Sequence, residues 1–244
     1  VSNYIPLLKR SNKKNTTFKE VLSHSAGWLP YIPHQNLVYK KNSEFKKRTL
    51  SLELNKKYPN QISDSLFIHK NYAKKIIRRI KKTELETLGD YLYSGLWFFL
   101  LPELTKKLSG LSFTDFLNTH FYSPLRLERL TFLPINHFSK NEIVPTEIDY
   151  FFRKQLVQGW VHDEAAAMMG GISGNAGLFS NASSIAPLLQ LFLQKGIVNE
   201  TQYLKSKTLK TFTQRTYPKS ENRRGLGFDK PSFIKEGRYP SSSI

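Results

Sequence analysis

A short polar segment directly before an apolar run contains the residues of this sequence best suited to chemistry. Residues 91–100 read YLYSGLWFFL. A tyrosine held beside a cation can accept and return a proton, which makes Tyr93 a candidate general base. The same pattern is typical of a helix entry, in which Ser94 would cap the first turn. This segment alone leaves both interpretations open.

The other candidate groups have simpler structural interpretations. His24 is predicted to be a buried or helix-end hydrogen-bonding residue rather than a catalyst. His162 and Asp163 are adjacent, and adjacent residues rarely face each other, so they predict a turn rather than a catalytic dyad. The glycines between 170 and 177 follow no predicted strand and precede no Lys-Ser/Thr pair, which argues against a phosphate-binding loop. The six histidines show no metal-ligand spacing, so we expect no metal.

Composition places the chain among folded proteins. It has 244 residues, a hydrophobic content of 39% and no cysteine. These values suit a packed domain and exclude disulfides, thiol nucleophiles and cysteine metal sites. No apolar run reaches the roughly 18 to 20 residues that cross a bilayer. The start shows no targeting signal and no Met, so we expect the chain to begin in mid-protein.

The net charge of +18 could serve binding to nucleic acid, anionic lipid or an acidic polymer. Lysines are spread along the whole chain, however, and aromatic residues are not interleaved with them as in single-strand binders. We therefore favour a compositional origin of the charge and no nucleic-acid partner. In the densest run, residues 74–82, isoleucines recur at helical spacing and cations occupy the other face. This pattern predicts an amphipathic surface helix.

Patterning along the chain predicts a mostly helical body. Thr17 and Glu20 form a capping-box pattern for a short helix, which Gly27 would end. Residues 28–62 are rich in Pro, Lys and Asn, which predicts a long irregular excursion. The remaining predictions begin with a helix or strand, followed by the basic helix, over 63–79. Helices are predicted over 96–108 (apolar, and interrupted near Pro102), 113–121, 183–193 (capped by Asn181 or Ser183) and 208–213. Residues 131–150 are predicted to be extended and loop-like, 165–178 small and Gly-rich, and the end from 217 polar and turn-rich, with a tail at 231–244.

Five short motifs together resemble the serine β-lactamase-like hydrolases, the group of class C β-lactamases, related esterases and DD-peptidases. Tyr93-Ser94-Gly95 falls where that group has Tyr-x-Asn or Tyr-Ser-Asp. The other four are VLSHSAG at 21–27, similar to LLxHxSG; YSPLRL at 122–127, similar to the YxPLGM turn; GGISGNAGLFSNA at 170–182, similar to GGxxGHAGLFSxA; and RGLGF at 224–228, similar to the GLGF strand. The order of the motifs matches the group over roughly residues 1–230. Residues 145–163 resemble a Bacteroidetes-type subgroup, sometimes fused behind a glycoside hydrolase family 3 domain.

The resemblance implies an α/β (α+β) fold of the β-lactamase/DD-peptidase type. It implies acyl transfer from an amide or ester through a serine acyl-enzyme, with Tyr93 as proton shuttle and with Ser94, Gly95 and Asn175 near the substrate. It further implies no cofactor, a small-molecule or peptidoglycan-type substrate, and a periplasmic or envelope location. It leaves the oligomeric state open. The chemistry requires Ser-x-x-Lys on one helical face and an edge strand with Lys-Thr-Gly or His-x-Gly.

The chain departs from this pattern at several positions. Gly95 replaces the Asn or Asp, and Asn175 replaces the usual His. The two Ser-x-x-Lys matches, at 11–14 and 43–46, lie in predicted polar loops, whereas the family's motif would lie before Val1. We therefore expect one partial domain over 1–244 that holds the helical subdomain, lacks part of the antiparallel sheet and the nucleophile, and is inactive alone. The alternative is a catalytically degenerate, basic binding module.

Overall fold

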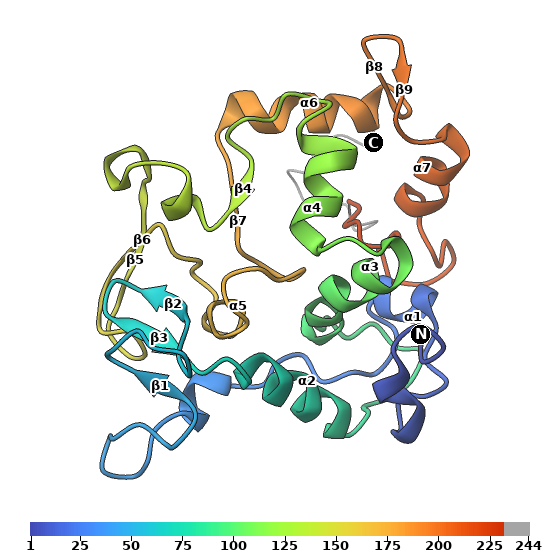
Figure 1. Cartoon of the computed structure of the whole chain (residues 1–244). Coiled ribbons are helices and arrows are strands. Elements are labelled where there is room, and N and C mark those ends of the chain that lie inside the picture. The colour runs from blue at the N-terminus through green and yellow to red at the C-terminus, as the bar shows by residue number, and fades with distance from the viewer. Residues whose placement is uncertain (232–244) are drawn as a thin grey trace.

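The computed structural model describes residues 1–231; the predicted polar tail, apart from its first residue, lies outside these residues. Short helices and small antiparallel sheets alternate along the chain (Figure 1). The α-helices are α1 (Phe18–Leu22), α2 (Tyr72–Lys82), α3 (Leu101–Ser109), α4 (Phe113–Leu117), α5 (Glu164–Met168), α6 (Ala182–Leu193) and α7 (Ser206–Thr213). Helical turns of other types are η1 (Pro6–Arg10), η2 (His34–Leu37), η3 (Leu96–Leu100), the π-helical η4 (Asn118–Tyr122), η5 (Pro134–Asn136) and η6 (Lys140–Glu142).

The strands form one three-stranded sheet and three two-stranded pairs within residues 1–231. The sheet has the order β1-β3-β2, built from Leu50–Ser51, Leu66–Ile68 and Asn60–Ser63. The pairs are β4 (Thr131–Phe132) with β7 (Leu178–Phe179), β5 (Pro145–Asp149) with β6 (Gln155–Gln158), and β8 (Ile197–Val198) with β9 (Thr201–Gln202), all antiparallel. Helices and separate antiparallel strands make this an α+β fold, as predicted.

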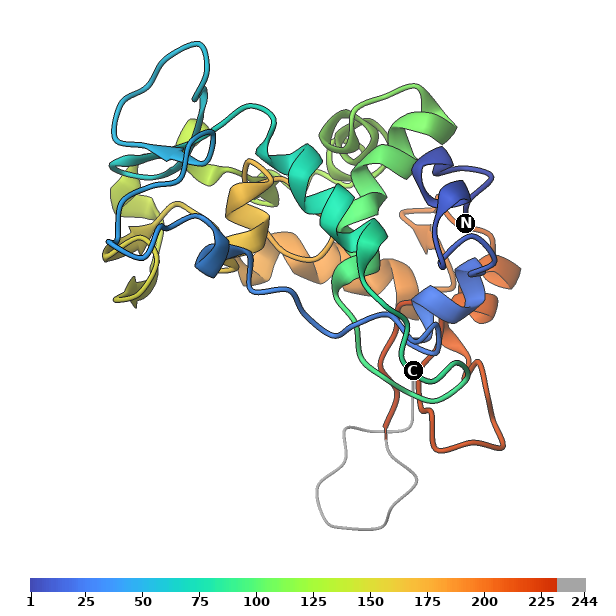
Figure 2. The same cartoon turned by 90° about the horizontal axis from the view of Figure 1, so that it is seen from below.

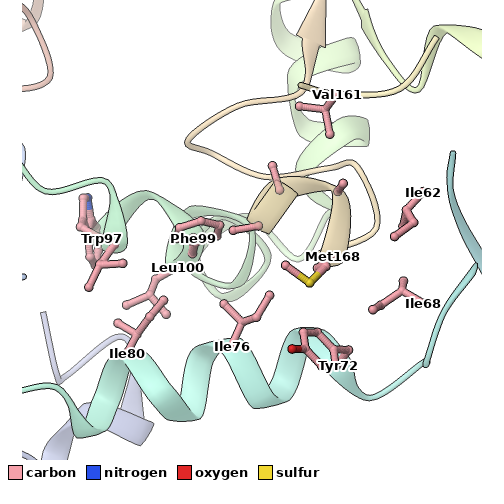
Figure 3. Close-up of a cluster of buried hydrophobic side chains, with 14 of the residues drawn as sticks. Ile62, Ile68, Tyr72, Ile76, Ile80, Trp97, Phe99, Leu100, Val161 and Met168 are labelled. Atoms are coloured by element: carbon pink, nitrogen blue, oxygen red, sulfur yellow. The ribbon is translucent and has the colours of Figure 1, made fainter. Parts of the chain in front are cut away.

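The main core lies along α2. Tyr72, Ile76 and Ile80 recur at helical spacing and are fully buried. Figure 3 shows them facing Leu100 of η3 and Met168 of α5. The sheet and the β5–β6 pair lie at one end of the molecule, and η1, α1 and α7 lie at the other (Figures 1 and 2). A second, smaller apolar cluster joins α6 to the chain before β4, with Leu191 fully buried.

Several predicted elements are confirmed by their caps and ends. Thr17 and Glu20 form the capping box of α1. The apolar helix is divided as expected, because Pro102 stands in the first turn of α3, directly after η3. The side chain of Asn181 accepts a hydrogen bond from the Ser184 N–H and caps α6. The basic amphipathic helix is α2, with its isoleucines buried.

Other predictions were wrong. The excursion at 28–62 is not wholly irregular, since it contains η2, β1 and most of β2. Patterning did not predict α5, which opens the small, Gly-rich stretch at 165–178 and whose first turn is capped by Asp163. No strand forms over 224–228, where the family resemblance predicts one. The helix predicted over 113–121 changes to π-helical geometry from Asn118.

Candidate functional site

The segment 22–28 is held between two other parts of the chain. Its first partner is the stretch before η3, which runs alongside it: Leu92 donates its N–H to the His24 carbonyl at 2.8 Å, and Glu86 donates to the Gly27 carbonyl at 2.7 Å. A Cβ on Gly27 would lie 2.6 Å from the Glu86 carbonyl oxygen, and the φ of Gly27 is +64°. Gly27 is therefore required by this close approach. It does not end α1, which already stops at Leu22.

His24 is a buried positioning residue. Its backbone lies in the left-handed region, with a φ of 56°, and its side chain is 4% exposed. Nδ1 accepts a hydrogen bond from the Ser94 N–H at 3.2 Å, and the ring centroid lies 4.4 Å from that of Tyr93. Burial, followed by the positive charge of Arg224, lowers the pKa of His24 to about 4. A neutral imidazole thus orients the Tyr93-Ser94 backbone, in agreement with the structural interpretation of His24.

Tyr93 and Ser94 have different environments although they are adjacent. Ser94 is buried, donates its hydroxyl to the Leu29 carbonyl at 2.7 Å and accepts from the Leu96 N–H at 3.3 Å. Gly95, and not Ser94, occupies the N-cap position of η3. Tyr93 is 54% exposed. The phenol is therefore available to a reactant, whereas the Ser94 hydroxyl is occupied by the backbone.

Arg224 is a neighbour of Tyr93 that sequence reasoning missed. Its guanidinium carbon lies 5.4 Å from the centroid of the Tyr93 ring, and Nη2 donates to the Tyr91 hydroxyl at 3.1 Å. Asp229 accepts from Arg223 at 2.6 Å and lies 3.3 Å from Arg224. Arg224 is the first residue of the RGLGF motif, so the family resemblance already marked this segment. Its position beside Tyr93 follows only from the tertiary fold.

The C-terminal part of the described chain is the second partner of the segment that contains His24. Asn222 is buried and donates its side-chain amide to the Ser23 carbonyl at 3.0 Å. Gly227 donates its N–H to the Leu22 carbonyl at 2.8 Å. These contacts hold Arg224 over the two tyrosines. Motifs at the two ends of the chain thus meet at one place.

The Gly-rich loop at 170–177 packs against η3, the element that directly follows Gly95. A Cβ on Gly174 would lie 2.5 Å from the Phe98 carbonyl oxygen, so only glycine allows this contact. Asn175 accepts a hydrogen bond from the Ser173 hydroxyl at 2.6 Å. Within residues 1–231, no hydrogen bond joins Asn175 to Tyr93 or Ser94. The loop thus packs on the helix that follows Tyr93, but the Asn175 side chain does not reach the phenol.

His162 and Asp163 turn to separate partners, which confirms the predicted structural turn. Asp163 accepts from the Ala166 N–H at 2.6 Å, and Nδ1 of His162 lies 3.1 Å from Glu147. Glu147 also accepts from Arg153, whose side chain is fully buried. Arg153 further donates to Asp149 at 2.9 Å and to the Val161 and His162 carbonyls at 2.6 Å. This cluster ties the β5–β6 pair to the start of α5.

The two Ser-x-x-Lys matches do not form a nucleophile site with Tyr93. Ser11 follows η1 and donates its hydroxyl to the Leu8 carbonyl at 2.8 Å. Ser43 stands in a surface turn with a φ of 62°. Among residues 1–231, no hydrogen bond connects either serine with Tyr93. The cavity that His24 and Ser94 line measures about 10 Å³, which is too small for a substrate.

Residues 1–231 contain neither a clustered set of metal-ligating side chains nor a helix suited to cross a bilayer. No group of three or more His, Asp or Glu side chains there is arranged to hold a metal ion. No helix formed by residues 1–231 combines the length and apolarity needed to cross a bilayer.

An α+β chain with these motifs gathered around η3 has the architecture of the β-lactamase and penicillin-binding protein homologues. The model of the family described as Beta-lactamase matches residues 1–232, and the chain belongs to this family. This confirms the resemblance drawn from the five motifs.

Individual relatives support the same assignment. A protein of Salmonella agona (strain SL483), provisionally named a D-alanyl-D-alanine carboxypeptidase, is 29% identical over 88% of this chain and 49% of its own length. The structure of a D-stereospecific amidohydrolase from Streptomyces sp. matches 93% of this chain and 61% of its own, with a TM-score of 0.57 and 15% identity. FmtA from Staphylococcus aureus matches 94% of this chain and 52% of its own, with a TM-score of 0.57 and 14% identity. The chain spans about half the length of the curated relatives it matches.

Proposed function

We propose that this chain is part of a serine hydrolase that transfers an acyl group from an amide or ester by way of a serine acyl-enzyme. The observation that carries the proposal is the convergence of three family motifs: residues 24–27 contact the Tyr93-Ser94 backbone, and the 170–177 loop packs on η3 directly after it. The names of the Salmonella and Streptomyces relatives refer to amide hydrolysis. A small or peptidoglycan-type substrate and an envelope location are consistent with these names.

The proposed role of Tyr93 is to move a proton. A serine oxygen attacks the substrate carbonyl carbon and gives its proton to the Tyr93 oxygen. Tyr93 passes a proton to the leaving nitrogen or oxygen as the bond between that atom and the carbonyl carbon breaks, which leaves the acyl group on the serine. Water repeats the sequence to release the acid. Half of the Tyr93 surface is open to a reactant, and Arg224 supplies a positive charge beside the ring. Ser94, Gly95 and Asn175 are proposed to line the substrate position.

The nucleophile is proposed to lie outside residues 1–244. Neither Ser11 nor Ser43 shares a hydrogen bond with Tyr93 among the described residues, since Ser11 bonds the Leu8 carbonyl and Ser43 stands in a surface turn. We further propose that residues 1–244 fold as one domain together with the part of the protein that supplies the nucleophile.

Covalent labelling tests the proposal. This chain and a chain extended at both ends are incubated with a fluorescent penicillin and with a fluorophosphonate, and the intact mass is measured. An adduct on the extended chain alone would support the serine hydrolase and the position of its nucleophile. An adduct on the 244-residue chain would place the nucleophile within it and contradict our assignment.

A second candidate function is a catalytically degenerate binding module, in which case neither chain forms an adduct. Two observations favour it. Gly95 lacks the polar side chain that the family motif has at that position. A cavity of about 670 Å³ at α2 is lined mainly by cations, and Tyr93 is not among its lining residues.

A further inference from the structure

A strongly basic cavity of about 670 Å³ lies where α2 begins, beside the β1–β3 sheet. Its cations come from three separate segments: Arg48 before β1, Lys57 before β2, and the stretch from Lys70 to Arg78 at the start of α2. Sequence patterning explained the α2 lysines as an ordinary solvated helix face. In the fold, however, these lysines line the same cavity as Arg48 and Lys57, which are distant from them in sequence.

No acidic side chain compensates this charge. Neither Asp nor Glu lines the cavity. Among residues 1–231, the ion pairs of Lys and Arg involve other cations, such as Lys140 with Asp64 and Arg153 with Asp149. Within the cavity, Lys75 instead donates to the Arg48 carbonyl at 2.9 Å. Burial, and then neighbouring cations, lower the pKa of both Lys75 and His69. Like charges are thus held together without a counter-charge from the described protein.

The start of α2 adds to this positive potential. A helix N-terminus carries a partial positive charge and free N–H groups, and acidic residues normally occupy it. The first turn of α2 contains no acid, and its N-cap Asn71 makes no side-chain capping bond. Lys74 and Lys75 stand there instead, which opposes the helix dipole. Arg48, on the wall of the cavity, has a φ of 59°. A bound anion would relieve this repulsion.

The basic surface continues along α2. A second hollow of about 420 Å³ shares Lys75 and Arg78 with the first and reaches Lys82 at the end of the helix. It too has no acidic lining residue. Eleven helical residues span roughly 16 Å at 1.5 Å per residue. A track of this length suits several successive charges of a chain better than one small ion.

We propose that this track binds a linear polymer of phosphate groups, which it recognises through charge. The cations face into concave surfaces, which a flat bilayer cannot enter. Tyr58 is the one aromatic residue that lines either hollow, and its ring packs on His69 at 5.2 Å, so the track offers no series of stacking platforms for bases. This site is independent of Tyr93 and of acyl transfer.

Binding to linear inorganic polyphosphate, measured by isothermal titration calorimetry, tests the proposal. The pocket variant is Lys57→Glu/Lys74→Glu, and the matched control is Lys205→Glu/Lys207→Glu, which changes the net charge equally. Lys74 and Lys207 each stand in the first turn of a helix, where Glu complements the dipole, so both variants are expected to fold. We expect the pocket variant to bind polyphosphate at least about tenfold more weakly, the control to bind within about twofold of the original, and affinity to fall steeply with salt.

Several outcomes would overturn the site. Equal weakening in both variants would mean that net charge alone attracts the polymer, and absence of polyphosphate binding would reject the track. Binding of an oligothymidylate with the same number of phosphates at least about tenfold more tightly would indicate base recognition. Binding to phosphatidylglycerol vesicles without binding to polyphosphate would indicate a membrane surface. Serine labelling of the extended chain involves neither lysine pair. The result of the labelling experiment is therefore independent of the result of the polyphosphate experiment.

Discussion

The guanidinium carbon of Arg224 lies 5.4 Å from the centroid of the Tyr93 ring, although the two residues belong to motifs that are far apart in the sequence. The same arginine donates a hydrogen bond to the Tyr91 hydroxyl, so one guanidinium contacts both exposed tyrosines. Neither motif alone indicates this contact. It places a fixed positive charge beside the phenol that we propose as the proton shuttle.

Replacement of Tyr93 tests its proposed role. We expect Tyr93→Phe in the extended chain to slow acylation by a fluorescent penicillin by roughly 10²- to 10⁴-fold, the usual contribution of a positioned acid or base. Tyr91→Phe is the control, since Tyr91 contacts the same arginine. Unchanged acylation of Tyr93→Phe would remove Tyr93 from the mechanism.

Removal of Arg224 should raise the pKa of His24. Burial is the main reason for the low pKa of about 4, and the charge of Arg224 is the second. Arg224→Met removes only the second cause, so we expect an increase, read from the imidazole resonances in an NMR titration. Arg223→Met is the matched control, because Arg223 pairs with Asp229 and is not among the causes of the His24 shift. A larger increase in the control than in Arg224→Met would contradict the assignment.

Stability should fall in mild acid because of His24. Its pKa is about 4 in the fold, below its ordinary value of 6.5, so the unfolded chain takes up a proton below pH 6.5 that the folded chain does not. At pH 5 this costs about 2 kcal/mol of folding free energy relative to pH 7. His24→Asn keeps a hydrogen-bond acceptor and a residue that tolerates the left-handed backbone. We expect the urea unfolding free energy of this variant to depend less on pH between 7 and 5, and an equal dependence would refute the role of His24.

Substitution of Gly95 should leave the stability of the fold nearly unchanged, whereas substitution of Gly174 should lower it. Gly95 has a φ of −79°, and a Cβ there would meet no atom within 4 Å. Gly95→Asn, which restores the family residue, should therefore change the unfolding free energy by no more than about 0.5 kcal/mol. Gly174→Ala drives a Cβ against the Phe98 carbonyl and should cost about 1 to 3 kcal/mol. Thermal unfolding of both variants would show whether the loop at 170–177 packs on η3 this closely.

The buried Arg153 should be essential to folding. Its side chain is fully buried, and its loss would leave the Asp149 carboxylate, which is 5% exposed, without its cation. Arg153→Met should cost about 3 to 5 kcal/mol, as for other broken buried pairs. Arg129→Met removes a half-exposed partner of Glu142 and should cost less than about 1 kcal/mol. Similar denaturation midpoints for the two variants would contradict this difference.

Sequence alone determined the features that depend on neighbouring residues. The Thr17–Glu20 capping box, the Asn181 cap and the buried isoleucine stripe of α2 follow from local hydrogen bonds and helical periodicity, and all are present. The order of five motifs also sufficed to recognise the family, which the match over residues 1–232 confirms. The roles of Tyr93, Ser94, Gly95 and Asn175 remain predictions.

Tertiary structure decided the features that depend on residues far apart in the chain. Gly27 is constrained by the Glu86 carbonyl and Gly174 by that of Phe98, contacts that no local pattern encodes. Arg224 reaches Tyr93, and Arg48 and Lys57 join the α2 lysines, only because the chain folds back on itself. Spacing along a helix or strand reports which face a side chain occupies, but not which distant segment packs there. For that reason the chemical surroundings of Tyr93 and the basic track required the structure.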